Sequence, residues 1–116
     1  LPYETKEMLI ETVNFLNKLA IQGIKIHMLH ILKNTKLEKI YKSNPFSLLT
    51  KDQYIEIVCE QLKYLRPEIV IHRLTGDPKE DDLIEPKWTL KKIDVLNGID
   101  KYMKKNNIFQ GDYINL

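Results

Sequence analysis

Residues 23–41 read GIKIHMLHILKNTKLEKIY, and this segment decides the fold. It begins with an apolar run that alternates with period two, continues into a loop and ends in a helical pattern with a lysine at every third position. The run predicts a strand over residues 24–29, whose two faces carry Ile24, Ile26 and Met28 on one side and Lys25, His27 and Leu29 on the other. Polar groups in a buried strand need a hydrogen-bonding partner or a ligand. Lys25, His27 and His30 therefore indicate a functional position.

The overall composition restricts the class of protein. The chain has 116 residues, a net charge of +2 and one cysteine, Cys59. A single cysteine excludes an intramolecular disulfide and a set of cysteine ligands for zinc or an iron–sulfur cluster within this chain. No apolar run approaches membrane-spanning length and no signal-peptide pattern is present, so we expect a cytoplasmic protein without a membrane partner. The start at Leu1 without an initiator Met indicates a piece of a longer protein.

Four helices and two strands are expected along the chain. The helices cover residues 4–20, 35–42, 51–64 and 89–105, with Thr50 and Thr89 as N-caps of the last two. The second strand covers residues 68–74, and an acidic loop follows at 75–86. The last helix is expected to turn inward Leu90, Ile93, Leu96, Ile99 and Met103. Because a helical crossover separates the two strands, the fold class is α/β with parallel strands.

Two strands are too few for a stable open parallel sheet. Parallel strands are normally buried within a larger sheet, and exposed strand edges tend to pair with another chain. Either a second copy of this chain or further strands of a larger protein must complete the sheet. For the isolated chain we expect a homo-oligomer formed through exposed strand edges.

The two predicted strands, IKIHML and IVIHRL, share the pattern I-x-I-H-x-L. This echo predicts that His27 and His72 occupy equivalent positions on neighbouring strands. Ligands of open α/β sheets and barrels collect at the carboxyl ends of the strands. His27, His30, His72 and Arg73 all lie near that end, and Asp77 follows directly after Gly76.

Each polar group also has an ordinary structural interpretation. The histidines fit hydrogen-bonded residues inside a barrel, Cys59 fits a buried free thiol, and a metal site at these residues lacks motif spacing. The acidic loop fits a solvated segment. The basic residues fit either phosphate contacts or a solvated face, and they are Lys33, Lys36, Lys39 and Lys42 in one region and Lys91, Lys92, Lys101, Lys104 and Lys105 in another.

Four blocks of sequence resemble a known family. They are LPYET at 1–5, the segment 23–41 with its N-T-x-L helix start, VIHRLTGD at 70–77 and WTLKKIDVLNGID at 88–100. Together they resemble the carboxyl-terminal half of YhcC/YtqA-type radical S-adenosylmethionine (radical SAM) proteins, which are related to the catalytic subunit of Elongator. LPYET is similar to the family's GLPGET motif, with Tyr3 where a glycine is common.

The resemblance implies the carboxyl-terminal part of a partial (β/α)6 TIM-like barrel. Residues 1–45 would end the radical SAM core, and residues 46–116 would form its carboxyl-terminal extension. Family members bind a 4Fe-4S cluster through three closely spaced cysteines and use it to cleave S-adenosylmethionine. Those cysteines have no counterpart in this chain. We therefore expect the cluster and S-adenosylmethionine in the full-length parent, no cofactor in this chain alone, and the missing amino-terminal half of the barrel as its partner.

Position within the family implies roles for six residues. Lys25, His27 and His30 become candidates for the cofactor-facing wall, and His72, Arg73 and Asp77 become candidates for the substrate side. The resemblance identifies no catalytic residue and no metal ligand in this chain.

The family also implies a function. A bacterial enzyme that modifies tRNA at the wobble uridine is expected, and the present chain would be inactive alone because it lacks the cluster ligands. The alternative is a free-standing α/β module that binds RNA or a protein without catalysis.

Overall fold

The computed structural model describes residues 4–114, so Leu1, Pro2 and Tyr3 of the LPYET motif lie outside the described residues. The elements are, in order, α1 (Lys6–Asn17), β1 (Gly23–Lys25), β2 (Ile31–Leu32), α2 (Lys36–Ser43), α3 (Lys51–Tyr64), β3 (Val70–Arg73), η1 (Glu80–Asp82), β4 (Leu83–Glu85), η2 (Lys87–Leu90) and α4 (Lys92–Lys105).

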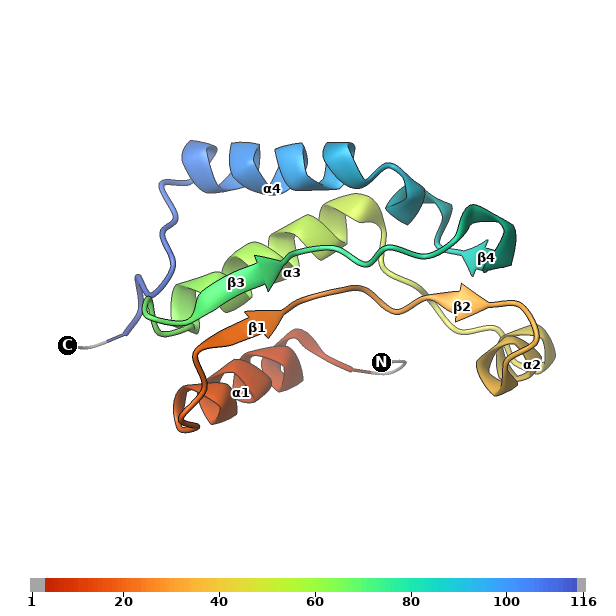
Figure 1. Ribbon diagram of the computed structural model, residues 1–116, viewed down its shortest axis with the longest axis horizontal. Helices are drawn as coiled ribbons and strands as arrows, with labels where there is room; N and C mark the ends of the chain where they lie inside the picture. Colours follow the sequence, from red (N-terminus) through yellow and green to blue (C-terminus); the bar gives the residue numbers. More distant parts are fainter. Residues whose placement is uncertain (1–3, 115–116) are drawn as a thin grey trace.

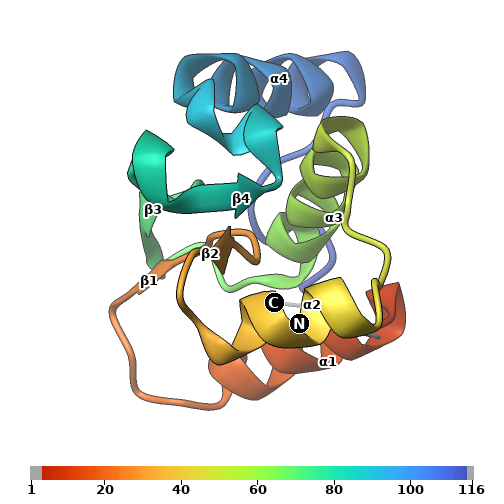
Figure 2. The ribbon, with the colours of Figure 1, turned by 90° about the vertical axis from the view of Figure 1, so that its right-hand side faces the viewer.

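The parallel pair β1–β3 is covered on one face only. Helices α1 and α3 lie behind the pair, and α4 packs against α3 along the upper side of the molecule (Figures 1 and 2). On the opposite face the side chains of Lys25, Val70, His72 and Arg73 are exposed. The predicted parallel α/β arrangement is confirmed, and it leaves an open face at the centre of the molecule.

The first strand is shorter than the sequence pattern predicted. Regular pairing ends at Lys25, although the Ile26 N–H still donates to the Arg73 carbonyl at 2.7 Å. The chain stays extended and reaches β2, which pairs antiparallel with β4. This second sheet was missed, and the predicted loop at 75–86 in fact contains η1 and β4. Strands of two and three residues carry too little alternation to be recognised in a sequence.

The register of β1–β3 differs from the one that the sequence echo predicted. Gly23 pairs with Val70 and Ile24 with Ile71, and a bulge then pairs Lys25 with Arg73. His72 therefore packs across Gly23, where any Cβ would overlap the imidazole ring. The expectation that His27 and His72 occupy equivalent positions is wrong, because the echo does not set the register.

Helix α3 covers the residues that the sequence predicted, 51–64, and it lies in the hydrophobic core. Thr50 and Gln53 form a capping box at its start. Its inward residues are all buried, namely Tyr54, Ile55, Val58, Cys59 and Leu62, followed by Leu65 just after the helix. Complete burial of such side chains contributes about 1.5–3 kcal/mol each, so α3 supplies the surface on which the other helices pack.

Helix α4 begins later than predicted and turns a different face inward. Thr89 lies in η2 and makes no helix cap, and the helix starts at Lys92. Val95 and Ile99, one helical turn apart, are buried against α3, whereas Ile93 is 72% exposed. The expected inward positions Leu90, Ile93 and Leu96 are therefore wrong, because the apolar stripe was counted from a false start.

Asn34 explains the N-T-x-L start of α2. It has a φ of 62°, a left-handed conformation that asparagine and glycine adopt more readily than other residues. Its N–H donates to the Glu38 carboxylate at 2.9 Å, and the Thr35 hydroxyl accepts from the Glu38 N–H at 3.2 Å. The tight turn between β2 and α2 thus depends on the identity of residue 34.

Asn17 and Arg66 join the end of α1 to the segment between α3 and β3. The Asn17 amide donates to the Tyr64 carbonyl at 2.6 Å and accepts from the Arg66 N–H at 2.8 Å. The Arg66 guanidinium donates to the carbonyls of Asn17, Leu19 and Ile21. Both strands are therefore entered from turns that hydrogen bonds hold together.

No helix within residues 4–114 has the length and apolar character that crossing a membrane requires.

Replacing Asn17 by Ala should lower the free energy of unfolding by about 1–3 kcal/mol, because two backbone groups at the turn lose their partners. The matched control is Asn14→Ala on the exposed side of the same helix, which should change stability by less than about 0.5 kcal/mol. Urea unfolding followed by circular dichroism measures both. Equal effects of the two substitutions would show that Asn17 does not hold the turns together.

Candidate functional site

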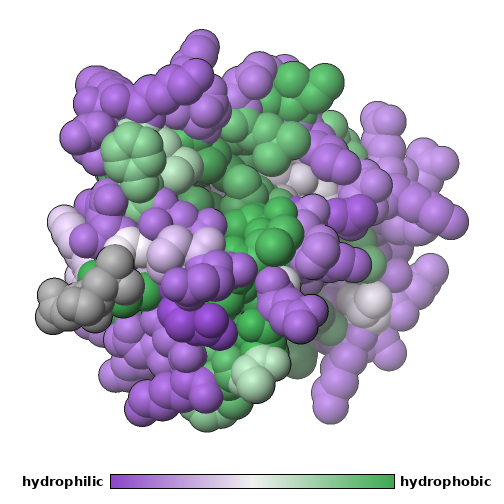
Figure 3. Space-filling view, turned by 60° about the vertical axis from the view of Figure 1, so that its left-hand side comes forward, coloured by the Kyte–Doolittle hydropathy of each residue, from purple (hydrophilic) through white to green (hydrophobic). Residues whose placement is uncertain are grey.

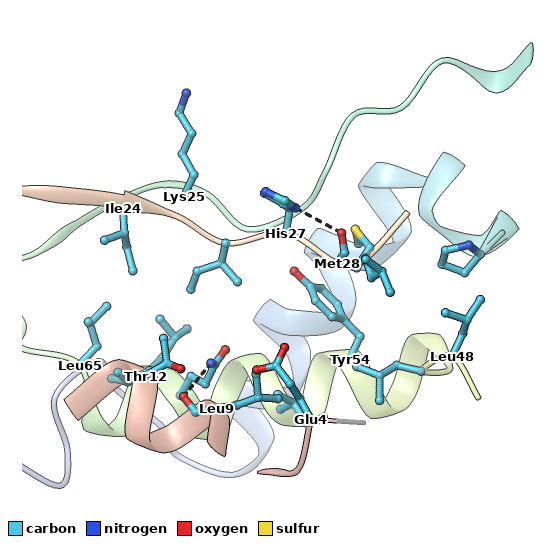
Figure 4. A pocket seen from close by; sticks show the side chains of 18 of the residues that line it. Glu4, Leu9, Thr12, Ile24, Lys25, His27, Met28, Leu48, Tyr54 and Leu65 are labelled. Carbon is cyan, nitrogen blue, oxygen red and sulfur yellow. Dashed lines mark hydrogen bonds between the residues drawn. The ribbon is translucent and has the colours of Figure 1, made fainter. Parts of the chain in front are cut away.

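Lys25 and His27 point away from the helices, onto the open face of β1. Figure 4 shows both side chains on one side of the strand and Ile24 on the other, directed toward α1 and α3. Ile24 and Ile26 pack against the core, while Lys25 and His27 are exposed. The alternation predicted for this strand is confirmed, and its polar residues are available to a ligand or a further layer of protein.

His30 is held in place by contacts with three segments of the chain. Its Nε2 lies 3.1 Å from the Thr89 hydroxyl, and its ring stacks on that of His27 with 6.5 Å between centroids. The ring also sits against Gly76, where any Cβ would overlap it. The sequence indicated His30 but missed both Thr89 and the reason for glycine at position 76.

Met28 joins the same cluster. Its sulfur accepts from the Thr89 hydroxyl at 3.1 Å and from the Gly76 N–H at 3.3 Å. A threonine hydroxyl has one proton, so when it donates to Met28 it must accept from His30. In that arrangement the proton of neutral His30 is on Nε2, and Nδ1 is an acceptor.

Burial, and next to it repulsion from His27, lower the pKa of His30 below its usual range. His30 is therefore neutral at neutral pH. A neutral imidazole held at both its ring face and its Nε2 is suited to orienting a ligand or a neighbouring side chain rather than to carrying charge.

The predicted substrate-side residues lie on and after β3. Arg73 stands beside Lys25 in the ladder, and His72 lies across Gly23 at the start of β1. Asp77 is exposed, one residue beyond the glycine that contacts His30. The structure thus brings together His27 and His30, and separately Lys25 and Arg73, but it places His72 away from His27.

A cavity of about 540 Å³ lies on the other side of β1, between this strand and helices α1 and α3 (Figure 4). Its wall is mainly apolar, with Leu9, Val13, Leu16, Ile24, Leu48 and Tyr54, and Lys25 and His27 also contribute to its lining. The Glu4 carboxylate points into the space between α1 and the strand. Glu4, the acidic residue of LPYET, was not among the predicted site residues, although its place in that motif was the signal that could have found it.

The residues of this chain do not fit an iron–sulfur cluster. Cys59 is buried in the core and its thiol faces the Ile99 carbonyl at 3.8 Å. Burial raises the pKa of this thiol to about 11, whereas a cluster ligand must be a thiolate. Within residues 4–114, no group of three or more His, Cys, Asp or Glu side chains is placed to hold a metal ion.

Lysines predicted to form basic regions lie at the surface. Lys33, Lys36, Lys39 and Lys42 are exposed, and Lys42 forms an ion pair with Glu38 at 2.9 Å within α2. In α4, Lys104 pairs with Asp100 at 2.9 Å.

On another side of the molecule, hydrophobic residues reach the surface in a band between polar ones (Figure 3).

Replacing His27 by Ala should raise the pKa of His30, because one of the two causes that lower it is repulsion from His27. His72→Ala, across Gly23, should leave the pKa of His30 unchanged. Proton NMR titration of the imidazole resonances measures both. A pKa of His30 that does not respond to His27→Ala would contradict the stacked arrangement.

The lowered pKa of His30 also predicts how stability depends on pH. Protonation favours the unfolded chain, whose histidines have a pKa of about 6.5. The contribution of His30 to stability is therefore complete above that value and is lost as the pH falls below it toward the folded-state pKa.

The comparisons with known proteins agree with this geometry. The model of the Radical_SAM C-terminal domain matches residues 21–105. The chain is 39% identical to YtqA of Bacillus subtilis (strain 168) over 113 residues and 34% identical to a Methanocaldococcus jannaschii protein over 112 residues. These matches cover 97% and 96% of the chain, which spans about a third (35%) of the length of each relative.

A solved structure shows the same fold. The chain resembles the archaeal Methanocaldococcus infernus Elp3 with an N-terminal deletion (1–46), with a TM-score of 0.76 and 15% sequence identity. The match covers 95% of this chain and 26% of that structure. The resemblance to YtqA-type proteins is thereby confirmed, and the chain belongs to the radical SAM C-terminal domain family.

Proposed function

We propose that this chain closes the barrel of a radical SAM enzyme that modifies tRNA at the wobble uridine. Family membership supports the radical SAM assignment, and the chain spans 35% of its curated relatives. The remainder of such an enzyme would supply the amino-terminal half of the barrel and the cysteines that hold the 4Fe-4S cluster. In family members, the cluster and S-adenosylmethionine together generate the radical that attacks the substrate.

The observation that carries the proposal is the open face of β1. Within residues 4–114 this strand is paired on one edge only, with β3, and its face with Lys25 and His27 is uncovered. Parallel strands normally have neighbours on both edges. The free edge suits a further barrel strand, which would turn the open face into the inside of the barrel. In isolated chains the same edge would pair with another copy.

Inside such a barrel the residues of this chain would bind and orient. Lys25 and His27 offer donors on the strand, and His30 is fixed by Thr89 and Gly76 at the strand's end. We propose these three as the cofactor-facing wall. His72, Arg73 and Asp77, on and beyond β3, would face the substrate.

RNA is favoured over a small molecule because of the exposed cations. Arg73 lies beside Lys25 in the ladder, and Lys33, Lys36, Lys39 and Lys42, in and before α2, are exposed to solvent. Cations at these positions can neutralise phosphates, and binding through them weakens as the salt concentration rises. The same residues are also the basis of an RNA-binding module without catalysis.

The isolated chain should be catalytically inert. After reconstitution with iron and sulfide, the 116-residue chain should show no 4Fe-4S absorbance and should not cleave S-adenosylmethionine, because Cys59 is its only cysteine and is buried. Visible spectroscopy and chromatography of 5′-deoxyadenosine measure these properties. A cluster in the isolated chain that cleaves S-adenosylmethionine would contradict the assignment.

The full-length parent provides the test of tRNA modification. Reconstituted enzyme should convert tRNA that lacks wobble-uridine modification, detected by mass spectrometry of nucleosides. His27→Ala should lower the rate at least about tenfold, equivalent to about 1.4 kcal/mol. Lys18→Ala, at the exposed end of α1, is the control and should have little effect. Product from a small molecule but none from tRNA would exclude the proposed substrate.

A further inference from the structure

A second hollow, of about 380 Å³, lies between the carboxyl end of β3 and the start of α4. It shares no lining residue with the apolar cavity behind β1. Its polar lining comes from His72, Arg73, Thr75 and Lys92, and Leu74 and Leu96 contribute apolar wall.

Thr75 is the unusual member of this lining. Its side chain is 0% exposed, and its hydroxyl is the buried side-chain oxygen that has no hydrogen-bond partner within residues 4–114. Leaving a buried hydroxyl unpaired costs about 1–3 kcal/mol. Polar groups of the residues on either side of it are paired, since the Leu74 carbonyl accepts from Tyr54 and the Gly76 N–H donates to Met28. An unpaired donor in this position indicates a ligand that can accept from it.

The start of α4 supplies further unpaired donors. Its N-cap, Lys91, makes no side-chain cap, and the first hydrogen bond into the helix is from Val95 to Lys91. Among the described residues, the N–H groups of Lys92, Ile93 and Asp94 have no acceptor. Three unpaired N–H groups and the helix dipole favour an anion at a helix start.

The charges around the hollow are mainly positive. Arg73 and Lys92 line it directly with His72, and Lys91 precedes Lys92 at the helix start. Two carboxylates lie close in sequence to the lining residues: Asp94 in the first turn of α4 and Asp77 after β3. Both are exposed to solvent. Neither of them lines the hollow.

We propose that this hollow binds a phosphate group. Its lining offers several donors, namely the Thr75 hydroxyl, the Arg73 guanidinium and the Lys92 ammonium, and phosphate offers several strong acceptor oxygens to such a set. This inference rests on the proposed function, in which the substrate is RNA. The phosphate then belongs to the RNA backbone and is held at the end of β3, and the base lies on the open face. Arg73, between the two surfaces, positions the backbone relative to Lys25.

Titration of the 15N-labelled chain with inorganic phosphate provides the first test. Saturable shifts should appear at the amides of Thr75, Lys92 and Ile93. Thr75→Val removes the hydroxyl but keeps the shape, and it should weaken phosphate binding about tenfold. It should not lower the free energy of unfolding, because the hydroxyl has no partner to lose. Thr75→Ser should restore binding.

Lys92→Gln should weaken phosphate binding as well, whereas Lys101→Gln on the exposed side of the same helix is the matched control for general charge. Absence of saturable shifts, equal effects of Lys92→Gln and Lys101→Gln, or full binding by Thr75→Val would each overturn the site.

A second arm distinguishes RNA from free phosphate. With single-stranded RNA, Thr75→Val should lower affinity by a similar factor, and inorganic phosphate should compete. Phosphate binding with unchanged RNA affinity in Thr75→Val would overturn the RNA assignment. This outcome is distinct from failure of the proposed function, in which full-length parent with an intact phosphate site would produce no modified nucleoside.

Discussion

The arrangement of the two parallel strands depends on the hydrogen bonds between Asn17 and Arg66. The β1–β3 ladder has only three registered pairs and could not determine its own alignment. The Arg66 guanidinium binds three carbonyls of the turn that enters β1, and the Asn17 amide binds two backbone groups of the turn that enters β3. Gln110, from the far end of the chain, adds bonds to the carbonyls of Arg66 and Ile69. Because both strands start from one hydrogen-bonded junction, this junction contributes to fixing their register.

A second junction holds the strands where they leave the sheet. Met28 and His30 follow β1, Gly76 follows β3, and Thr89 comes from η2, yet all four are in contact. The carboxyl end of the sheet, where α/β proteins place their ligands, is therefore more rigid than its short ladder suggests. This rigidity matters for the proposed site, since a ligand wall must hold its side chains within a fraction of an ångström to be effective.

Local signals in the sequence predicted the parts of the fold that local chemistry determines. The bounds of α3 follow from its capping box at Thr50, and the two faces of β1 follow from alternation. Thr89 shows where such reasoning fails, because a threonine before an apolar helix is typical of a cap, whereas here it is buried as a partner of His30 and Met28. The short sheet β2–β4 and the bulge at His72 depend on contacts between distant segments, which no local pattern contains. The candidate residues were identified from their places on and after the predicted strands and their roles from a resemblance, but their grouping required the register.

The two sides of β1 differ in a way that supports an incomplete sheet rather than a finished surface. Behind the strand lies an apolar cavity that the helices do not fill, and in front lie exposed Lys25 and His27. A strand that ended a stable domain would be protected at its free edge by charge, a bulge on that edge or a covering loop. β1 carries one such charge, Lys25, and the bulge of the ladder lies on the paired edge, where β3 has the extra residue His72. A free, regular edge between an apolar cavity and a polar face is what a neighbouring barrel strand requires, since that strand would fill the cavity with one set of side chains and extend the polar face with the other.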